Sequence, residues 1–270
     1  MKPLLHLLQS HDVICCDPLR WKSQMDLVAA MEERADMQDP NEPDTDYWGD
    51  PIEKLRIENG IAIVPVKGIL CAGLPSIARR FGYVDPDDVD EDLEMARADD
   101  SVTSVWLDMN CPGGTLGGIS ELAAKIRGMD KPTCAYGSMI CSAAYWIASG
   151  CNRIMTTALG DVGSIGVYTA FIDRSGWLAQ LGMSVKLFAS GKYKGAGVTG
   201  SLTKDQSALI QDRVNAIAAN FKSWVNSCRP GMSENDMQGQ SFLGADAAQR
   251  KLTDGTCASL SEAIADYTAS

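Results

Sequence analysis

From Ile61 onward, strand-like and helical segments alternate along the chain. The runs Ile61–Leu70 and Val102–Asn110 are apolar enough to be buried strands, and the acidic segment between them, DVDEDLEMARA, has the pattern of a helix. This alternation is typical of a layered α/β domain, in which helices cover a sheet. The length of 270 residues suits one such domain with appendages.

The alternation continues through the middle of the chain. A helix is predicted over Gly118–Arg127, with Ile119, Leu122, Ala123 and Ile126 on one face. The later expectations are a short strand TCAYGS from Thr133 leading into a loop at Ser142, a helix AAYWIAS, a strand at RIMTT, a short helix near Trp177 and a strand at SVKLF.

A long helix is predicted from about Thr203 to Cys228. Its apolar residues recur every three or four positions, at Ile210, Val214, Ile217, Phe221 and Val225. We expect this stripe to face the core, with a subunit interface as the alternative.

The first 56 residues differ from the rest. Residues 35–51, ADMQDPNEPDTDYWGDP, contain six acidic residues and three prolines, which leaves little to bury. We therefore predict an N-terminal helical arm over residues 1–34, an acidic linker over 35–56 and one folded domain over 57–270.

Charge and composition exclude several kinds of partner. The net charge of −11 argues against a nucleic-acid surface, so we expect protein or peptide partners. Nine cysteines without a C-x-x-C pair and only two histidines give no metal or disulfide pattern, which favours a reducing cytoplasm. No apolar run reaches the length of a membrane span, so we expect a soluble protein without a membrane anchor.

Three segments carry candidate chemistry. GSMICSAAYWIASG places Ser142 at the predicted start of a helix, NCPGGT follows a predicted strand, and FASGKYKGAG places Lys192 and Lys194 in a glycine-rich loop. A serine nucleophile needs a base, and its oxyanion needs backbone donors, which glycine-rich turns expose. Each segment also has an ordinary interpretation: a helix N-cap, a β-turn and a solvated loop.

The base is the most constrained of these groups. Both histidines, His6 and His11, precede the acidic linker, which leaves a lysine amine as the leading alternative. An amine is a base only when desolvation lowers its pKa from about 10.4 by several units.

Four motifs together resemble a known family. NCPGG, GSMICSAAYW, GDVGSIGV and SGKYKGAG are similar, in order and rough spacing, to motifs of the signal peptide peptidase A family of serine peptidases. The similarity runs from about Gly60 to Asp266 and ends in a segment that resembles the family's closing helix, strand and helix. It implies an α/β ClpP/crotonase-like layered fold with repeated ββα units.

The resemblance also implies roles for residues. Ser142 matches the nucleophile, Lys194 the general base of a Ser-Lys dyad, and Ser164 the serine that orients the lysine. Gly113, Gly114 and Ala143 match the oxyanion hole and substrate-binding backbone, and the family's chemistry uses no metal or cofactor. The family commonly has glycines where Ala143 and Ala144 stand, which predicts a tighter pocket, and serine at Cys111, a change of little expected consequence.

The function implied is that of a serine endopeptidase. The chain resembles soluble bacteriophage capsid assembly proteases, which implies scaffold and head proteins as substrates, the host cytoplasm or prohead as location, and a homo-oligomer that encloses its sites. The alternatives are a cytoplasmic peptidase that degrades signal peptides or other peptides, an acyl-CoA-binding relative and a non-catalytic shell component. Cys141 is a further alternative nucleophile, although its side chain should point away from that of Ser142.

Overall fold

The computed structural model describes residues 14–16, 45–46, 49–74 and 76–269. Of the predicted arm over 1–34 it describes only β1 (Ile14–Cys16), which is a strand, and the rest of that prediction lies outside the described residues. Most of the predicted linker over 35–56 lies outside them too. Near its end, Thr45 and Pro51 form an isolated antiparallel bridge.

The main sheet has seven strands. Four are parallel neighbours: β3 (Ile61–Lys67), β6 (Ser104–Cys111), β8 (Thr133–Cys141) and β9 (Arg153–Gly163). At one edge of the sheet, β2 (Arg56–Glu58) pairs antiparallel with β3. At the other edge, β9 pairs antiparallel with β10 (Ser241–Leu243) and parallel with the short β11 (Gly255–Thr256). The strands at TCAYGS and RIMTT are therefore longer than predicted, because both continue to the edge where the site lies.

A second, four-stranded sheet stands beside the first in the order β1, β7 (Gly113–Thr115), β4 (Ile69–Leu70), β5 (Tyr83–Val84). The predicted strand Ile61–Leu70 is split between the two sheets at Gly68, whose φ is +126°. Two of the main strands are followed by short strands and then a helix: β6 and β7 precede α4 (Ile119–Arg127), and β3 to β5 precede α3 (Pro86–Ala98). The repeated ββα units of the expected layered α/β fold are confirmed.

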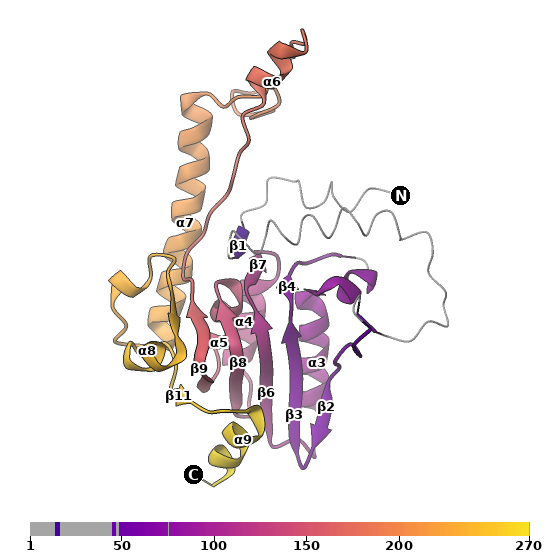
Figure 1. Ribbon diagram of the computed structural model, residues 1–270, viewed down its shortest axis with the longest axis vertical. Helices are drawn as coiled ribbons and strands as arrows, with labels where there is room; N and C mark the ends of the chain where they lie inside the picture. Colours follow the sequence, from indigo (N-terminus) through magenta and orange to yellow (C-terminus); the bar gives the residue numbers. More distant parts are fainter. Residues whose placement is uncertain (1–13, 17–44, 47–48, 75, 270) are drawn as a thin grey trace.

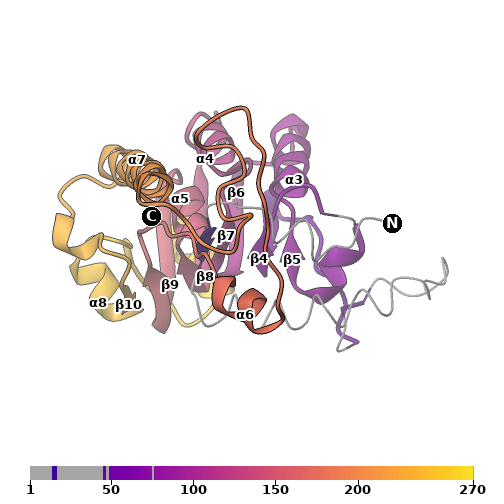
Figure 2. The same cartoon turned by 90° about the horizontal axis from the view of Figure 1, so that it is seen from above.

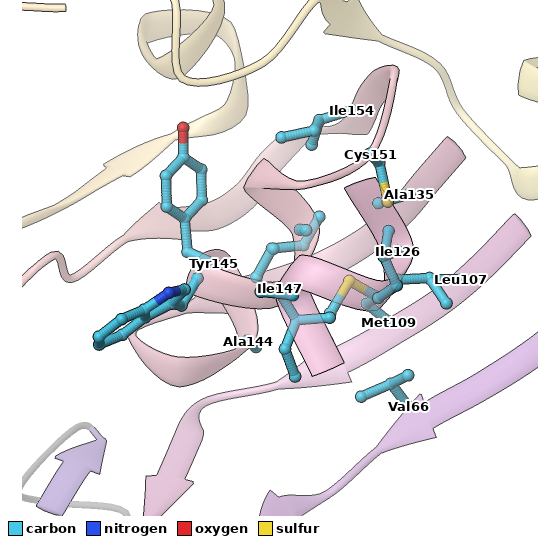
Figure 3. Close-up of a cluster of buried hydrophobic side chains, with 14 of the residues drawn as sticks. Val66, Leu107, Met109, Ile126, Ala135, Ala144, Tyr145, Ile147, Cys151 and Ile154 are labelled. Carbon is cyan, nitrogen blue, oxygen red and sulfur yellow. The ribbon is translucent and has the colours of Figure 1, made fainter. Parts of the chain in front are cut away.

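Helices cover one face of the main sheet. Figure 2 shows α3, α4 and α7 (Lys204–Cys228) in a row on the same side of the strands. The predicted inner face of α4 is confirmed, since Ile119, Leu122, Ala123 and Ile126 are all buried. In the close-up of Figure 3, Val66, Leu107 and Met109 from the strands meet Ala144 and Ile147 of α5 (Ala143–Ser149).

The opposite face of the sheet has a smaller core. Alternate residues of a strand point to opposite faces, so Ile61 and Ile63 pack here while Ala62 and Val64 face the helices. The cover is α9 (Leu260–Thr268), which follows α8 (Gly244–Gln249) and β11 in the predicted order of helix, strand and helix.

The long helix α7 is confirmed in extent and leaves the body of the protein. It begins with a capping box, in which the Thr203 side chain accepts from Gln206 N–H and the Gln206 side chain accepts from Thr203 N–H. Only its second half reaches the core, where Phe221 stacks on Trp146 with ring centroids 4.4 Å apart. Figure 1 shows the first half rising away from the sheet together with α6 (Ser175–Gln180). The expectation that the whole stripe faces the core is therefore correct for its second half only.

The strand predicted at SVKLF is wrong. Residues 184–188 form no strand, and Phe188 is 92% exposed. The alternation of apolar residues resembles a strand, but a strand needs a partner to pair with, and this segment lies on the projecting arm. We call residues 166–203 the projecting arm, and from here on "the arm" means this segment and not the N-terminal residues 1–34.

Stability is expected to fall above about pH 9. Burial raises the pKa of the Cys134 thiol from 9.0 to about 12, and it also raises the pKa of the Cys151 thiol. Above pH 9 the unfolded chain loses protons that the folded chain keeps, so alkali stabilises the unfolded state, by about 1 kcal/mol per thiol near pH 10. Urea unfolding at pH 8 and pH 10 should show this loss, and the variant Cys134→Ala/Cys151→Ala should show less of it; an equal loss in both chains would contradict this explanation.

Candidate active site

Three of the four motifs, those with Gly113, Ser142 and Ser164, are brought together by strand register. Across the parallel strands β6, β8 and β9, Cys111 is the partner of Ile140, and Ile140 is the partner of Val162. Two residues beyond this row the chain reaches Gly113, Ser142 and Ser164. The sequence therefore brings the three motifs to one point at the carboxyl edge of the sheet, where ligands of α/β proteins commonly bind.

Ser142 occupies a sharp turn from strand to helix. It follows β8 and precedes α5 with φ of 56° and ψ of −119°, a strained conformation for a residue with a side chain. Its N–H donates to the carbonyl of Gly163 over 2.7 Å, and its own carbonyl accepts from Trp146 N–H over 2.9 Å. These two backbone hydrogen bonds hold the turn in place. Ser142 is 1% exposed.

The glycine strand β7 lies beside this turn. Helix α5 packs against β7, and Gly113 has φ of +104°, which a residue with a side chain rarely adopts. Gly114 is the partner of Leu70 in β4, and a Cβ on Gly114 would lie 1.8 Å from the carbonyl oxygen of Leu70. The close approach of two backbones explains the second glycine. Ala143 begins α5, so its N–H has no acceptor within the helix.

Replacing Gly114 by alanine should destabilise the fold. The new Cβ would collide with the backbone of Leu70, so β4 and β7 would have to separate. We expect a loss of about 3 kcal/mol, the upper end for overpacking, and a melting temperature lower by about 10 °C. The matched control is Gly176→Ala in α6, where nothing lies within 4 Å of the new Cβ. Equal melting temperatures for Gly114→Ala and wild type would contradict this account of β7.

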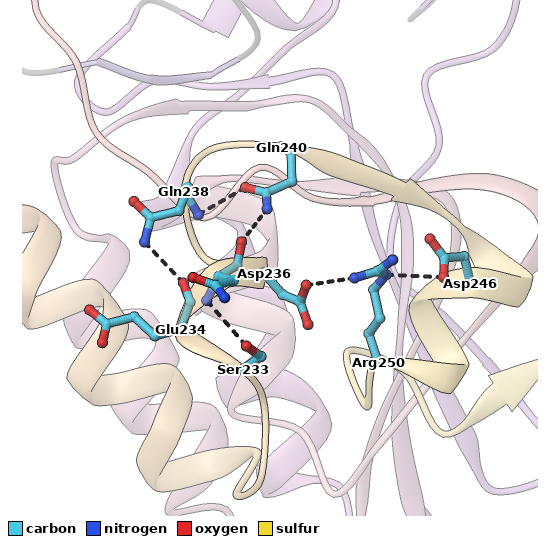
Figure 4. A network of polar contacts seen from close by, with 8 residues as sticks. Ser233, Glu234, Asp236, Gln238, Gln240, Asp246 and Arg250 are labelled. Atoms are coloured by element: carbon cyan, nitrogen blue, oxygen red, sulfur yellow. Dashed lines mark hydrogen bonds and ion pairs between the residues drawn. The ribbon is translucent and has the colours of Figure 1, made fainter.

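Ser164 is held by a polar network. It has φ of 51°, and its N–H donates to the carbonyl of Gln240 over 2.8 Å. The Gln240 side chain accepts from Gln238 N–H over 2.9 Å and donates to the carbonyl of Asn235 (Figure 4). Gln240 could not be identified from the sequence, because its contribution is a backbone carbonyl, which no residue type signals. The loop before β10 therefore positions the third site motif.

Lys194 is not brought to this edge of the sheet. It is exposed, in a turn where its N–H donates to the carbonyl of Gly191 over 3.0 Å. Its neighbour Lys192 forms an ion pair of 2.6 Å with Asp205, at the first turn of α7. Because Phe221 marks where α7 meets α5, about 24 Å of helix separates the two places at 1.5 Å per residue. The loop with Lys194 thus lies at the end of α7 that projects from the body of the protein, away from the point where α7 packs on α5.

Cys141, the residue before Ser142, directs its side chain away from the turn. The thiol of Cys141 points to β9, with Sγ 3.5 Å from the carbonyl oxygen of Asp161. Over the part of the chain that the structure describes, no three His, Cys, Asp or Glu side chains gather as a metal site would require. None of the described helices is both long and apolar enough to cross a membrane.

The chain is similar to proteins of phage head assembly. It is 36% identical over 179 residues to the head-tail preconnector protein GP5 of Enterobacteria phage P21, an alignment that covers 65% of this chain and 36% of that protein. It is 29% identical over 206 residues to the capsid assembly protease C of Escherichia phage lambda, covering 74% and 47%. The chain thus spans between about a third and a half of the length of these two relatives.

Among solved structures, a mutant of ClpP1 from Listeria monocytogenes aligns over 74% of this chain and 93% of its own, with 8% identity and a TM-score of 0.48.

The model of peptidase family S49 matches residues 125–267, more than half of the chain. The matched part contains Ser142, Ser164 and Lys194, while Gly113 and Gly114 precede it. On this match, the chain belongs to peptidase family S49.

Proposed function

We propose that this protein is a serine endopeptidase with Ser142 as nucleophile and Lys194 as general base. The observation that carries the proposal is the position of Ser142, on a strained turn between β8 and α5 and beside the glycine strand β7. Membership of family S49 supports the same chemistry.

The proposed reaction is acyl transfer. The neutral amine of Lys194 accepts the proton of the Ser142 hydroxyl as its oxygen attacks a peptide carbonyl. The N–H groups of Gly114 and Ala143 donate to the oxyanion, and Gly113 shapes the strand beside it. The resulting ammonium protonates the leaving amine, and a water molecule then hydrolyses the acyl-enzyme by the same steps. Ser164, which lies two residues after Val162 at the end of β9, orients the Lys194 amine.

Lys194 of a second copy of the chain would complete the site. Within one copy, the four-carbon stem of a lysine is far shorter than the length of α7 between the arm and α5. The arm also exposes large apolar side chains, among them Trp177 at 57% and Phe188 at 92%, which suit an interface between copies. Burial in that interface would favour the neutral amine that a general base requires. We therefore place the proposed dyad between two subunits of a homo-oligomer.

The proposed substrates are proteins of phage head assembly, such as scaffold and capsid proteins, cut in the host cytoplasm or the prohead. The similarity to the capsid assembly protease C supports this choice. The first experiment is incubation of the purified chain with casein, an unstructured protein, followed by mass spectrometry of the products. Cleavage supports the proposal, and an inert wild-type oligomer would favour a non-catalytic shell component.

A further inference from the structure

The glycine strand β7 has one edge that an extended peptide could use, and the chain itself occupies it. In the four-stranded sheet β7 lies between β4 and β1, with Leu70 of β4 paired to Gly114 on one side. On the other side β1 runs antiparallel, with Cys15 opposite Gly114 and Cys16 opposite Gly113. Every position of β7 is thus paired with β1.

This pairing matches the way in which proteins bind extended peptides. A peptide that adds a strand to a sheet edge forms backbone hydrogen bonds with that edge, largely independent of its sequence. The N–H of Gly114 is one of the proposed oxyanion donors, so a substrate with its carbonyl there would lie along β7. Because β4 takes the other edge, a substrate strand and β1 would compete for the same backbone groups.

The position of β1 close to Ser142 supports competition between β1 and a substrate strand. Gly113 comes two residues after Cys111, and Ser142 comes two residues after Ile140, the partner of Cys111 in β8. The segment Ile14–Cys16 is therefore paired with the backbone next to the proposed nucleophile, although more than a hundred residues separate them in sequence. A strand that served only to extend the small sheet could equally have paired with its far edge, at β5.

We propose that Ile14–Cys16 is a built-in competitive inhibitor, which holds the substrate-strand position on β7 until a substrate displaces it. This inference rests on the proposed peptidase function. Because Ile14–Cys16 belongs to the same chain as β7, its pairing is intramolecular, and it weakens the apparent affinity for an external peptide by occupying the same edge at a high effective concentration. The fold thereby restrains cleavage before a protein substrate is presented.

The test uses peptide binding, so that it does not depend on catalysis. All chains carry Ser142→Ala, and the probe is a fluorescein-labelled peptide of residues 11–19 with serine in place of both cysteines. The variant Ile14→Pro/Cys15→Pro removes two consecutive N–H groups, at least one of which faces β7 in any strand register. The matched control Ile14→Val/Cys15→Ser keeps both N–H groups.

We expect the proline variant to bind the probe at least tenfold more tightly than the control, as measured by fluorescence anisotropy. Equal affinities, or no binding by either chain, would overturn the inference. Casein cleavage by the parent chain with Ser142 separates the two proposals: if casein is cut and the affinities are equal, the inhibitor fails and the peptidase stands. Thermal unfolding of both variants checks that the domain is folded.

Discussion

Cleavage of casein should fall by at least about a thousandfold in Ser142→Ala, because no other hydroxyl stands on the turn between β8 and α5. The alanine keeps the backbone, and its Cβ is already present in serine, so the fold should be unchanged. Initial rates of peptide release, measured at equal concentrations of folded protein, provide the comparison.

The matched control is Cys141→Ser, one residue earlier. The Cys141 thiol points toward Asp161 of β9, so this variant should keep most of the activity. A loss of activity in Cys141→Ser together with normal activity in Ser142→Ala would make the thiol the nucleophile and overturn the assignment. Retained activity in both variants would show that neither Ser142 nor Cys141 is the nucleophile.

Lys194→Ala should lower the rate by about a hundred to ten thousandfold, the usual range for a general base. Lys192→Ala is the matched control on the same loop. The ion pair with Asp205 raises the pKa of Lys192, which is opposite to what a base requires. We therefore expect Lys192→Ala to keep most of the wild-type rate in the same casein assay.

Two results would contradict the role of Lys194. One is a normal rate in Lys194→Ala, and the other is an equal loss in both lysine variants, which would indicate a general effect of charge on the arm. Size-exclusion chromatography of each variant shows whether the assembly is unchanged.

The body of the fold follows from local sequence patterns. The inner face of α4 and the extent of α7 are decided by residues within a few helical turns, so the periodicity of apolar residues predicts them. The meeting of Gly113, Ser142 and Ser164 follows from parallel strands that end at one edge. The family resemblance names these motifs together, and the strand register explains why the fold brings them to one edge.

The arm and β1 depend on partners that lie far away in the sequence. SVKLF has the alternation of a strand, but whether another strand pairs with it is not decided within those five residues. The three residues of β1 are too few to carry a periodic signal, and their pairing with β7 is made by backbone groups. The family resemblance likewise predicts Lys194 as a base without placing it, because α7 carries the projecting arm away from the body of the protein.

The central claim is that Ser142 and Lys194 form one site across two copies of the chain, and mixing tests it most directly. Ser142→Ala and Lys194→Ala, each inactive alone, are co-expressed and purified as a mixed oligomer. An intact site then takes serine from one chain and lysine from the other, and random assembly predicts about a quarter of the wild-type rate of casein cleavage. A mixed oligomer that stays as inactive as its components would contradict a dyad shared between subunits.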